Sequence, residues 1–301
     1  MLNLTRIAPT PSGFIHAGNA LNFILIYTLA RHTNAKIELK IDDIDQNRSK
    51  DIYIEDIFET LKWLRLDWDL GACNKNDFLK NYSFAHKQKI LFKVILSLWR
   101  KNPDIFYACK CSRKGINGIY HGDCIKLNLE LEKEKTALKL HVDNDSNIIL
   151  RNRYVNIYSA FGDITLWQKE DFCSYQFASL FLDEDHKTSL IVRGDDLFNS
   201  TALQLYMARL FGFENFLQTT FIHHMLIFDS NGSKLSKSNG SNSLASWRKN
   251  GKKPNELFQK AAQIIGVKEF WQVNTKEDIL TCKDELDMFL RTNGQKVSSA
   301  F

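Results

Sequence analysis

One stretch decides the fold of this 301-residue chain: Thr5-Arg6-Ile7-Ala8-Pro9-Thr10-Pro11-Ser12-Gly13-Phe14-Ile15-His16-Ala17-Gly18-Asn19. It predicts a buried strand over 4–8, then a turn rich in proline and glycine, then a helix that opens at the His16-x-Gly18 motif. Backbone N–H groups at a helix N-terminus attract phosphate, and a glycine lets a nucleotide approach the backbone closely. The stretch therefore predicts a site for an anionic phosphate group.

A second motif, Ser233-Lys234-Leu235-Ser236-Lys237-Ser238, lies more than two hundred residues downstream and predicts a loop with two lysines. When a carboxylate attacks the α-phosphate of ATP, negative charge builds on the phosphate oxygens and on the leaving pyrophosphate. Catalysis then depends on in-line positioning and on preorganised positive charge, which Lys234 and Lys237 can supply. Either motif alone is explained equally well by chance or by a solvated basic loop, but their order and their flanking strands indicate ATP chemistry.

Together the two motifs resemble the signature motifs of class I aminoacyl-tRNA synthetases, and the first is similar to that of the glutamyl and glutaminyl branch. The resemblance implies activation of an amino acid with ATP and Mg²⁺. It implies catalytic roles for His16, Gly18, Lys234 and Lys237, with Ser236 joining these four in ATP binding.

The remaining pattern alternates between strands and helices, as in a doubly wound parallel sheet. The predicted strands cover 36–41, 189–193 and 221–228, and the predicted helices cover 20–31, 51–64, 86–99, 201–210, 254–265 and 279–291. The helix over 51–64 is expected to bury one face, made by Ile52, Ile57, Phe58, Leu61 and Leu64. Between 103 and 161 the pattern changes: two alternating segments, 137–142 and 148–151, follow a charged run over 130–135 that is expected to be a solvated helix face.

We therefore expect an α/β Rossmann-like class I synthetase core whose parallel sheet is interrupted by an α+β insertion that carries a zinc site, with a short helical C-terminal part. The expected ranges are 1–100 and 162–240 for the two halves of the catalytic domain, 101–161 for the insertion and 241–301 for the helical region. A polar loop is expected over 241–251, either facing tRNA through Arg248, Lys249, Lys252 and Lys253 or simply solvated.

Composition sets broader bounds. The net charge of +5 and the isoelectric point near 8.7 are compatible with a nucleic acid partner. No secretory signal and no apolar run long enough to span a bilayer is visible. The six cysteines are unevenly spaced, which favours a reducing compartment. We therefore expect a cytoplasmic, monomeric protein with no membrane partner. Cys73, Cys173 and Cys282 stand alone and are expected in the core.

A cysteine cluster, Cys109-x-Cys111 followed by Tyr120 and Cys124, predicts one structural Zn²⁺ per chain. Three thiolates within sixteen residues can converge on zinc, which takes four roughly tetrahedral ligands and favours sulfur. The alternative is three buried, inert cysteines. From the residues alone the fourth ligand is open between Tyr120 and His121. The spacing resembles the zinc site of a small synthetase-like family with ligands in the order Cys-x-Cys…Tyr-x-x-x-Cys, which implies Tyr120.

The strand that ends in Asp42-Asp43-Ile44-Asp45, with Arg48 after it, resembles a motif of the glutamyl branch. Acidic residues at the carboxyl end of a parallel strand lie where ligands bind in such sheets. The resemblance assigns the ammonium group of L-glutamate to Asp42, helped by Thr10, although the family usually has glutamate and serine at these places. Capping or local ion pairs are the expected roles of Asp43 and Asp45.

The segments 174–178 and 192–196 resemble two further glutamyl-branch motifs. A glutamate side chain suits the two-pronged guanidinium of an arginine, so Arg193, with Arg6, is the expected partner of the γ-carboxylate. Tyr175 would line the same pocket. The alternative for Arg193 is an ion pair with Asp195 or Asp196 at the strand end. The stretch 167–171 departs from the arginine-rich segment that the family has there.

Only 63 residues follow Ser238, and a separate anticodon-binding module usually needs about 50–250 residues. A catalytic core without that module, together with the cysteine–tyrosine pattern, resembles the glutamyl-queuosine tRNA(Asp) synthetase family. This implies that glutamyl-adenylate forms without tRNA and that glutamate is then transferred to queuosine in the anticodon of tRNA(Asp).

Two other functions stay open. The first is a truncated or minimal glutamyl-tRNA synthetase that charges the tRNA 3′ end. The second is a paralogue that binds tRNA or a nucleotide without catalysis; the departures at Thr10 and Asp42 favour it, and the intact His16-x-Gly18 and lysine motifs disfavour it.

Overall fold

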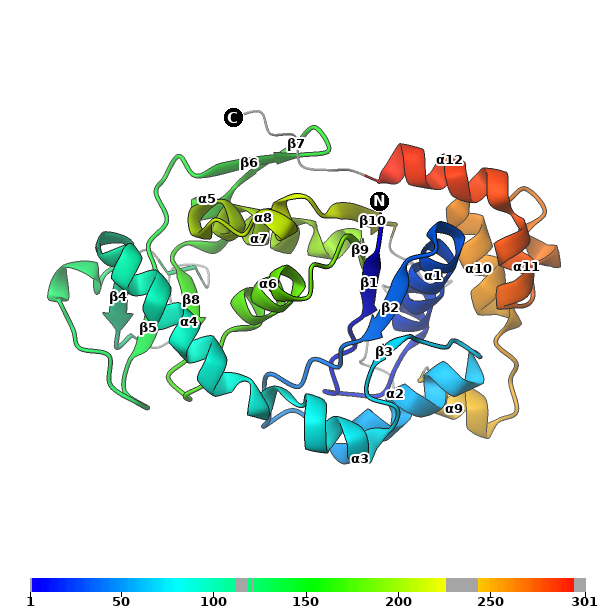
Figure 1. The fold of residues 1–301 in the computed structure, drawn as a ribbon, viewed down its shortest axis with the longest axis horizontal. Coiled ribbons are helices and arrows are strands. Elements are labelled where there is room, and N and C mark those ends of the chain that lie inside the picture. Colours follow the sequence, from blue (N-terminus) through cyan, green and yellow to red (C-terminus); the bar gives the residue numbers. More distant parts are fainter. Residues whose placement is uncertain (1, 112–118, 121, 226–242, 295–301) are drawn as a thin grey trace. The chain divides into compact units, whose positions relative to one another are not determined.

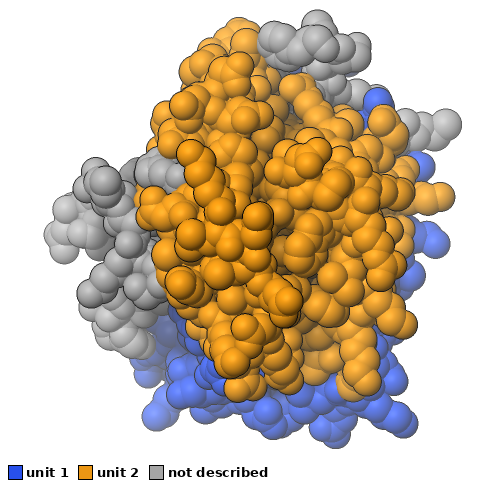
Figure 2. Space-filling model, turned by 90° about the vertical axis from the view of Figure 1, so that its left-hand side faces the viewer, with its two compact units in different colours: residues 1–83, 188–197, 218–301 blue, residues 84–187, 198–217 orange. Residues whose placement is uncertain are grey.

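A computed structural model describes residues 2–111, 119–120, 122–225 and 243–294 of the chain (Figure 1). Two compact units are present (Figure 2). The first unit comprises 1–83, 188–197 and 218–301, and the second comprises 84–187 and 198–217. No helix in the described part of the chain is both long enough and apolar enough to cross a membrane. The domain boundaries expected at 100, 161 and 240 stay a prediction.

Parallel strands form the sheet of the first unit, as the sequence predicts. Strands β1 (Leu4–Ile7), β2 (Lys36–Leu39) and β3 (Leu70–Gly71) pair in parallel in that order. Strands β9 (Leu190–Gly194) and β10 (Thr220–His224) form a second parallel pair. The backbone N–H of Ser189 donates to the carbonyl of Leu4 at 2.9 Å, so β9 and β1 begin side by side.

Helix α1 (Ala17–Thr33) crosses over from β1 to β2 and is buried on nearly every side. It packs against the sheet and against the C-terminal helices α10 (Asn255–Ile265), α11 (Lys276–Thr281) and α12 (Lys283–Asn293) (Figure 1). A helix that is apolar all round is stable only when it is covered on all sides. The C-terminal helices therefore complete the core of this unit, whose other helices are α2 (Asp51–Trp63), α3 (Lys75–Asp77) and α9 (Leu244–Lys249).

The second unit combines helices with antiparallel strands. Its three-stranded sheet has the order β4 (Phe106–Cys109), β5 (Ala137–Leu140), β8 (Ile164–Trp167). A separate hairpin joins β6 (Asn147–Leu150) to β7 (Arg153–Asn156). The helices are α4 (Gln88–Lys101), α5 (Ile157–Phe161), α6 (Tyr175–Asp185), α7 (Phe198–Phe211) and α8 (Glu214–Leu217). This confirms an α+β insertion and the two predicted strand segments within it.

Four local predictions are wrong. The charged run over 130–135 is exposed but forms a turn rather than a helix, and part of the expected polar loop is helix α9. Ile52 is 58% exposed, because α2 turns other residues, among them Ile54, towards the core. Cys73 is exposed, whereas Cys173 is buried as expected and Cys282 is half-buried.

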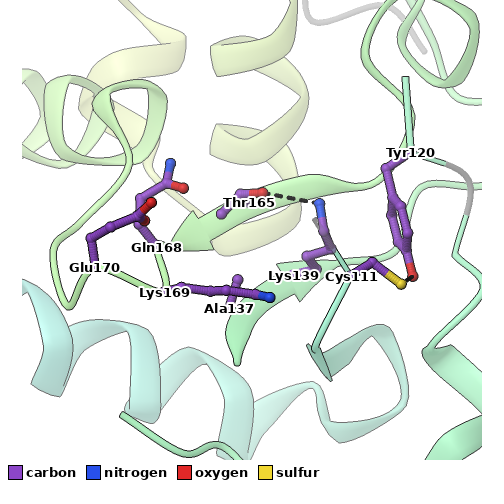
Figure 3. A pocket seen from close by; sticks show the side chains of 8 residues that line it. All are labelled: Cys111, Tyr120, Ala137, Lys139, Thr165, Gln168, Lys169 and Glu170. Carbon is purple, nitrogen blue, oxygen red and sulfur yellow. Dashed lines mark hydrogen bonds between the residues drawn. The ribbon is translucent and has the colours of Figure 1, made fainter. Parts of the chain in front are cut away.

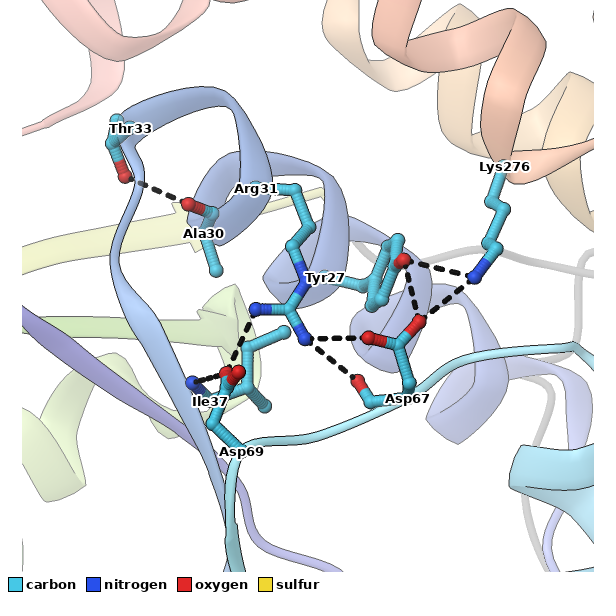
Figure 4. A network of polar contacts seen from close by, with 8 residues as sticks. All are labelled: Tyr27, Ala30, Arg31, Thr33, Ile37, Asp67, Asp69 and Lys276. Carbon is cyan, nitrogen blue, oxygen red and sulfur yellow. Dashed lines mark hydrogen bonds and ion pairs between the residues drawn. The ribbon is translucent and has the colours of Figure 1, made fainter.

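A polar network ties α1 to α11 through the segment after α2 (Figure 4). Asp67 accepts hydrogen bonds from Tyr27 and Lys276, each at 2.8 Å, and pairs with Arg31 at 2.8 Å. Arg31 also pairs with Asp69 at 2.7 Å. Partial burial raises the pKa of Asp67, but the hydrogen bonds and charges of Lys276, Tyr27 and Arg31 outweigh it and lower that pKa to about 2.

Asp67→Asn is expected to lower the free energy of unfolding at pH 7 by about 1 kcal/mol, since a largely exposed carboxylate is screened by water. The pKa of Asp67 is depressed in the folded state, so its contribution is present above pH 3.8 and is lost as the pH falls towards 2. Urea unfolding from pH 7 to pH 2 should therefore show the wild type and the variant converging as the pH falls from 3.8 to about 2. A constant difference across that range would contradict this role for the charge.

Candidate functional site

The first turn of α1 is built around His16. Its Nδ1 accepts a hydrogen bond from the backbone N–H of Gly18 at 3.1 Å, and the Asn19 side chain accepts from the His16 backbone in return. This reciprocal cap fixes the point at which the helix begins. An accepting Nδ1 carries no proton, so the neutral ring has its N–H at Nε2, where it can donate to an anionic oxygen.

A buried ion pair supports the segment just before His16. Asp56 on α2 accepts a hydrogen bond from the backbone N–H of Ile15 at 2.7 Å and pairs with Arg248 of α9 at 2.5 Å. Arg248 also donates to Thr60 at 2.7 Å. The Asp56 side chain is only 2% exposed, so its charge depends on Arg248 for compensation. Arg248 is therefore part of the fold, whereas the sequence left it open between facing tRNA and being simply solvated.

Charged side chains are buried around the carboxyl ends of β1, β2 and β9. Arg6 lies in β1, Asp42 follows β2, and Arg193 lies near the end of β9; each is at most 5% exposed. The backbone N–H of Asp42 donates to the carbonyl of Pro9 at 2.8 Å, so the pairing of the first two strands extends to Asp42. Buried charges of both signs at one sheet edge suit a zwitterionic ligand.

The remaining predicted residues have different positions. Thr10 lies in the turn after β1 and is exposed, and Tyr175 begins α6 in the second unit, 38% exposed. Asp43 accepts hydrogen bonds from Gln46 nearby and from Ser83, which is 40 residues further along the chain. Lys234, Ser236 and Lys237 lie outside the described residues.

The described residues on either side of the lysine motif both contact the start of the chain. His224, at the end of β10, lies 3.2 Å from Asn22 of α1 through its Nε2. Leu244 donates its backbone N–H to the carbonyl of Ile15 at 2.9 Å, and Ser243 forms a β-bridge with His16. The described residues that flank the lysine motif in the sequence therefore contact the first motif and the helix that follows it.

The three clustered cysteines converge in the second unit. The sulfur atoms of Cys109, Cys111 and Cys124 lie within 4.8 Å of one another, and those of Cys111 and Cys124 are 3.4 Å apart. The Tyr120 hydroxyl lies 3.8 Å from the sulfur of Cys111 and accepts from the backbone N–H of Cys124 at 2.8 Å. The three sulfurs and the Tyr120 hydroxyl therefore lie close together. A tetrahedral zinc with Zn–S bonds of about 2.3 Å would hold its sulfurs about 3.8 Å apart, so these residues fit that ion.

The electrostatics of the cluster favour deprotonated sulfur at one position. Burial raises the pKa of Cys124, but hydrogen bonds from Tyr120 and Cys111 outweigh it and lower that pKa to about 7. Burial and the hydrogen bond with Cys109 raise the pKa of Tyr120. The cluster could bind a metal ion through thiolate ligands. His121, the alternative fourth ligand, lies outside the described residues.

Asp163, which precedes β8, supports the loop that carries Tyr120. Its backbone N–H donates to the carbonyl of Tyr120 at 2.8 Å. Its carboxylate, which is fully buried, accepts from Tyr107 at 2.6 Å and from the backbone N–H of Val142 at 2.9 Å. Gly122 has φ +88°, and a Cβ there would lie only 2.7 Å from this carboxylate. A glycine is therefore required where the loop passes Asp163.

Sequence reasoning missed Asp56, Lys139 and Asp163. Asp56 and Thr60 are four apart on α2 and therefore share one face, next to the apolar stripe that the pattern does detect. The charged Asp56 beside that stripe is a sign in the sequence that a carboxylate could be buried there. Its partner Arg248 is 192 residues away, so the sequence does not show what compensates the charge.

Comparison with known proteins identifies the family. The family model described as tRNA synthetases class I (E and Q), catalytic domain, matches residues 4–301. The chain belongs to this family. The chain is 28% identical over 299 residues to glutamate–tRNA ligase 2 of Syntrophus aciditrophicus. This alignment covers 92% of the chain and 60% of that relative. The chain is 27% identical over 285 residues to the glutamyl-Q tRNA(Asp) synthetase of Rhodobacter capsulatus, covering 84% of the chain and 98% of that relative.

The fold of this class I domain is also found among solved structures. A glutamate–tRNA synthetase from Elizabethkingia anophelis superposes with a TM-score of 0.74 over 97% of the chain and 70% of that structure, at 17% identity. The domain spans 50–60% of the length of the glutamate–tRNA ligases of Syntrophus, Natranaerobius and Rickettsia massiliae that it matches.

Proposed function

We propose that this class I domain activates L-glutamate with ATP and Mg²⁺ to glutamyl-adenylate and transfers the glutamyl group to queuosine in the anticodon of tRNA(Asp). The observation that carries the proposal is the alignment with 98% of a glutamyl-Q tRNA(Asp) synthetase. The cysteine–tyrosine cluster is a second, independent support, because its spacing is the one that the sequence resemblance connects with this activity.

In the activation step, one carboxylate oxygen of glutamate attacks the α-phosphate, a P–O bond forms, and the bond to pyrophosphate breaks. The Nε2 proton of His16 and the N–H groups at the start of α1 are positioned to stabilise phosphate oxygens. We assign Lys234, Ser236 and Lys237 to the leaving pyrophosphate, because described residues on either side of them, His224 and Leu244, contact Asn22 and Ile15.

For the amino acid, we assign the ammonium group to Asp42 with Thr10, and the γ-carboxylate to Arg193 with Arg6. The burial of Asp42, Arg6 and Arg193 supports this, since charges held in a site of low dielectric bind an oppositely charged ligand strongly.

The proposal is tested by transferring labelled glutamate to two tRNA pools, one with queuosine and one without it. Label is expected only on the queuosine pool and is expected to survive removal of the 3′-terminal adenosine of the tRNA before the reaction. Label on both pools that is abolished by this removal would favour a glutamyl-tRNA synthetase instead, the function that the names of several relatives suggest. Label on neither pool, with no ATP–pyrophosphate exchange, would favour the non-catalytic alternative.

We also propose that Cys109, Cys111, Tyr120 and Cys124 bind one structural zinc ion. The fit of the sulfur separations to a tetrahedral site supports this ligand set. The ion, when bound, would hold the chain between β4 and the Tyr120 loop together. Metal analysis of protein purified without added zinc is expected to find about one zinc per chain. Folded, active protein with almost no metal would refute the site.

A further inference from the structure

Lys139 places a positive charge beside the cysteine cluster. It lies on β5, where its cross-strand partners are Tyr107 of β4 and Thr165 of β8. Side chains alternate along a strand, so Tyr107 and Cys109 of β4 lie on the same face as Lys139. The ammonium nitrogen is 4.5 Å from the centre of the Tyr120 ring. Figure 3 shows Lys139 between Thr165 on one side and Tyr120 and Cys111 on the other, at the wall of a cavity of about 430 Å³.

The hydrogen bonds of this ammonium group go to neutral acceptors. Lys139 donates to the Thr165 hydroxyl at 3.0 Å and to the backbone carbonyl of Asp163 at 3.4 Å. It forms no ion pair with a carboxylate in the described part of the chain. The Asp163 carboxylate is occupied by Tyr107, His141 and a backbone N–H. A cation that is mostly withdrawn from water needs an opposite charge nearby, and hydrogen bonds to neutral groups provide only part of that compensation.

The cysteine cluster would provide the missing negative charge once a metal ion is bound. Three thiolates around Zn²⁺ carry one net negative charge, and a deprotonated Tyr120 would add a second. A fixed positive charge beside the sulfurs stabilises that negatively charged, metal-bound state of the cluster.

We propose that Lys139 is the internal counter-ion of the metal–thiolate cluster and that its charge strengthens zinc binding. This inference rests on the proposed zinc site and adds a positioning residue to it. Lys139 does not ligate the metal; its ammonium group and the cluster compensate each other's charge across the Tyr120 ring.

The test measures zinc affinity in the full chain by competition with a chromogenic chelator. Lys139→Met removes the charge and keeps the length of the side chain, and it is expected to weaken zinc binding by about 10- to 100-fold, the usual effect of changing a group next to a metal ligand. Lys139→Arg keeps the charge and is expected to retain most of the affinity. The matched control is Lys126→Met, which removes an exposed lysine two residues from Cys124 and is expected to leave the affinity within about twofold of the wild type.

Cobalt substitution provides a readout that does not depend on activity. The thiolate-to-cobalt absorption should keep its intensity per bound ion in Lys139→Met, because the ligands are unchanged and only the affinity falls. If Lys139→Met does not fold, Lys139→Gln, which keeps a donor for Thr165, replaces it in the comparison.

Three results would overturn the proposal. The first is wild-type affinity in a folded, uncharged variant at position 139. The second is an equal loss in Lys126→Met, which would indicate a general effect of net charge. The third is loss of folding in every variant at this position, Arg included, which would mean that Lys139 serves packing. A wild type that binds no zinc would instead refute the metal site itself, so the two failures are distinguishable.

Discussion

Arg193→Ala is expected to lower glutamate-dependent ATP–pyrophosphate exchange by about 10³-fold, because truncating one partner of a buried charge pair costs about 2–5 kcal/mol. Arg193 is 5% exposed in β9, so water cannot take the place of its guanidinium at the proposed γ-carboxylate site. Exchange is measured as the incorporation of labelled pyrophosphate into ATP, with glutamate and ATP varied separately. The loss should fall on kcat/KM for glutamate, with little change in the KM for ATP.

Arg193→Lys is the matched control, since it keeps the charge and removes the planar fork that can hold both carboxylate oxygens. It is expected to recover only part of the exchange. Circular dichroism and thermal unfolding of the alanine variant would separate a loss of binding from a loss of fold. Unchanged exchange in a folded alanine variant would remove Arg193 from the site and would favour its alternative role, an ion pair with Asp195 or Asp196.

Arg248→Met is expected to lower the free energy of unfolding by about 3–5 kcal/mol, which is the usual cost of leaving a buried charge without its partner. The reason is Asp56, whose carboxylate is 2% exposed and is held between Arg248 and the backbone N–H of Ile15. Because Ile15 precedes the His16 cap, the exchange rate should fall as well. Urea unfolding followed by circular dichroism measures the stability term.

Two control variants test whether the buried charge is responsible. Asp56→Asn added to Arg248→Met keeps an acceptor for the Ile15 N–H but removes the charge, so the double variant should be more stable than Arg248→Met alone. Lys249→Met removes the adjacent, exposed cation of α9 and should change stability by less than about 0.5 kcal/mol. Equal destabilisation by Lys249→Met, or no recovery in the double variant, would contradict the role of the ion pair.

Local patterns predicted the parts of the molecule that depend on neighbouring residues. The helix after the Pro/Gly turn begins at Ala17 with His16 as its cap, and the strand–helix–strand order of the first hundred residues is confirmed. The predicted ends of α2 and α10 are within a residue of the observed ones. The prediction of a helix over 130–135 was wrong, because a charged run predicts exposure to solvent but does not require a helix. These residues form a turn instead.

The sequence by itself determined the parallel sheet, the motif that opens α1 and the convergence of three cysteines, because each depends on the spacing of residues close together in the chain. Only the tertiary structure decided which charges compensate one another. Asp56 finds Arg248 across 192 residues, and Lys139 meets the Tyr120 ring only after β5 has paired with β4. In water a charged residue needs no partner, so the sequence gives no sign of one. Once packing removes the charge from water, an oppositely charged or hydrogen-bonding partner is needed to offset that cost.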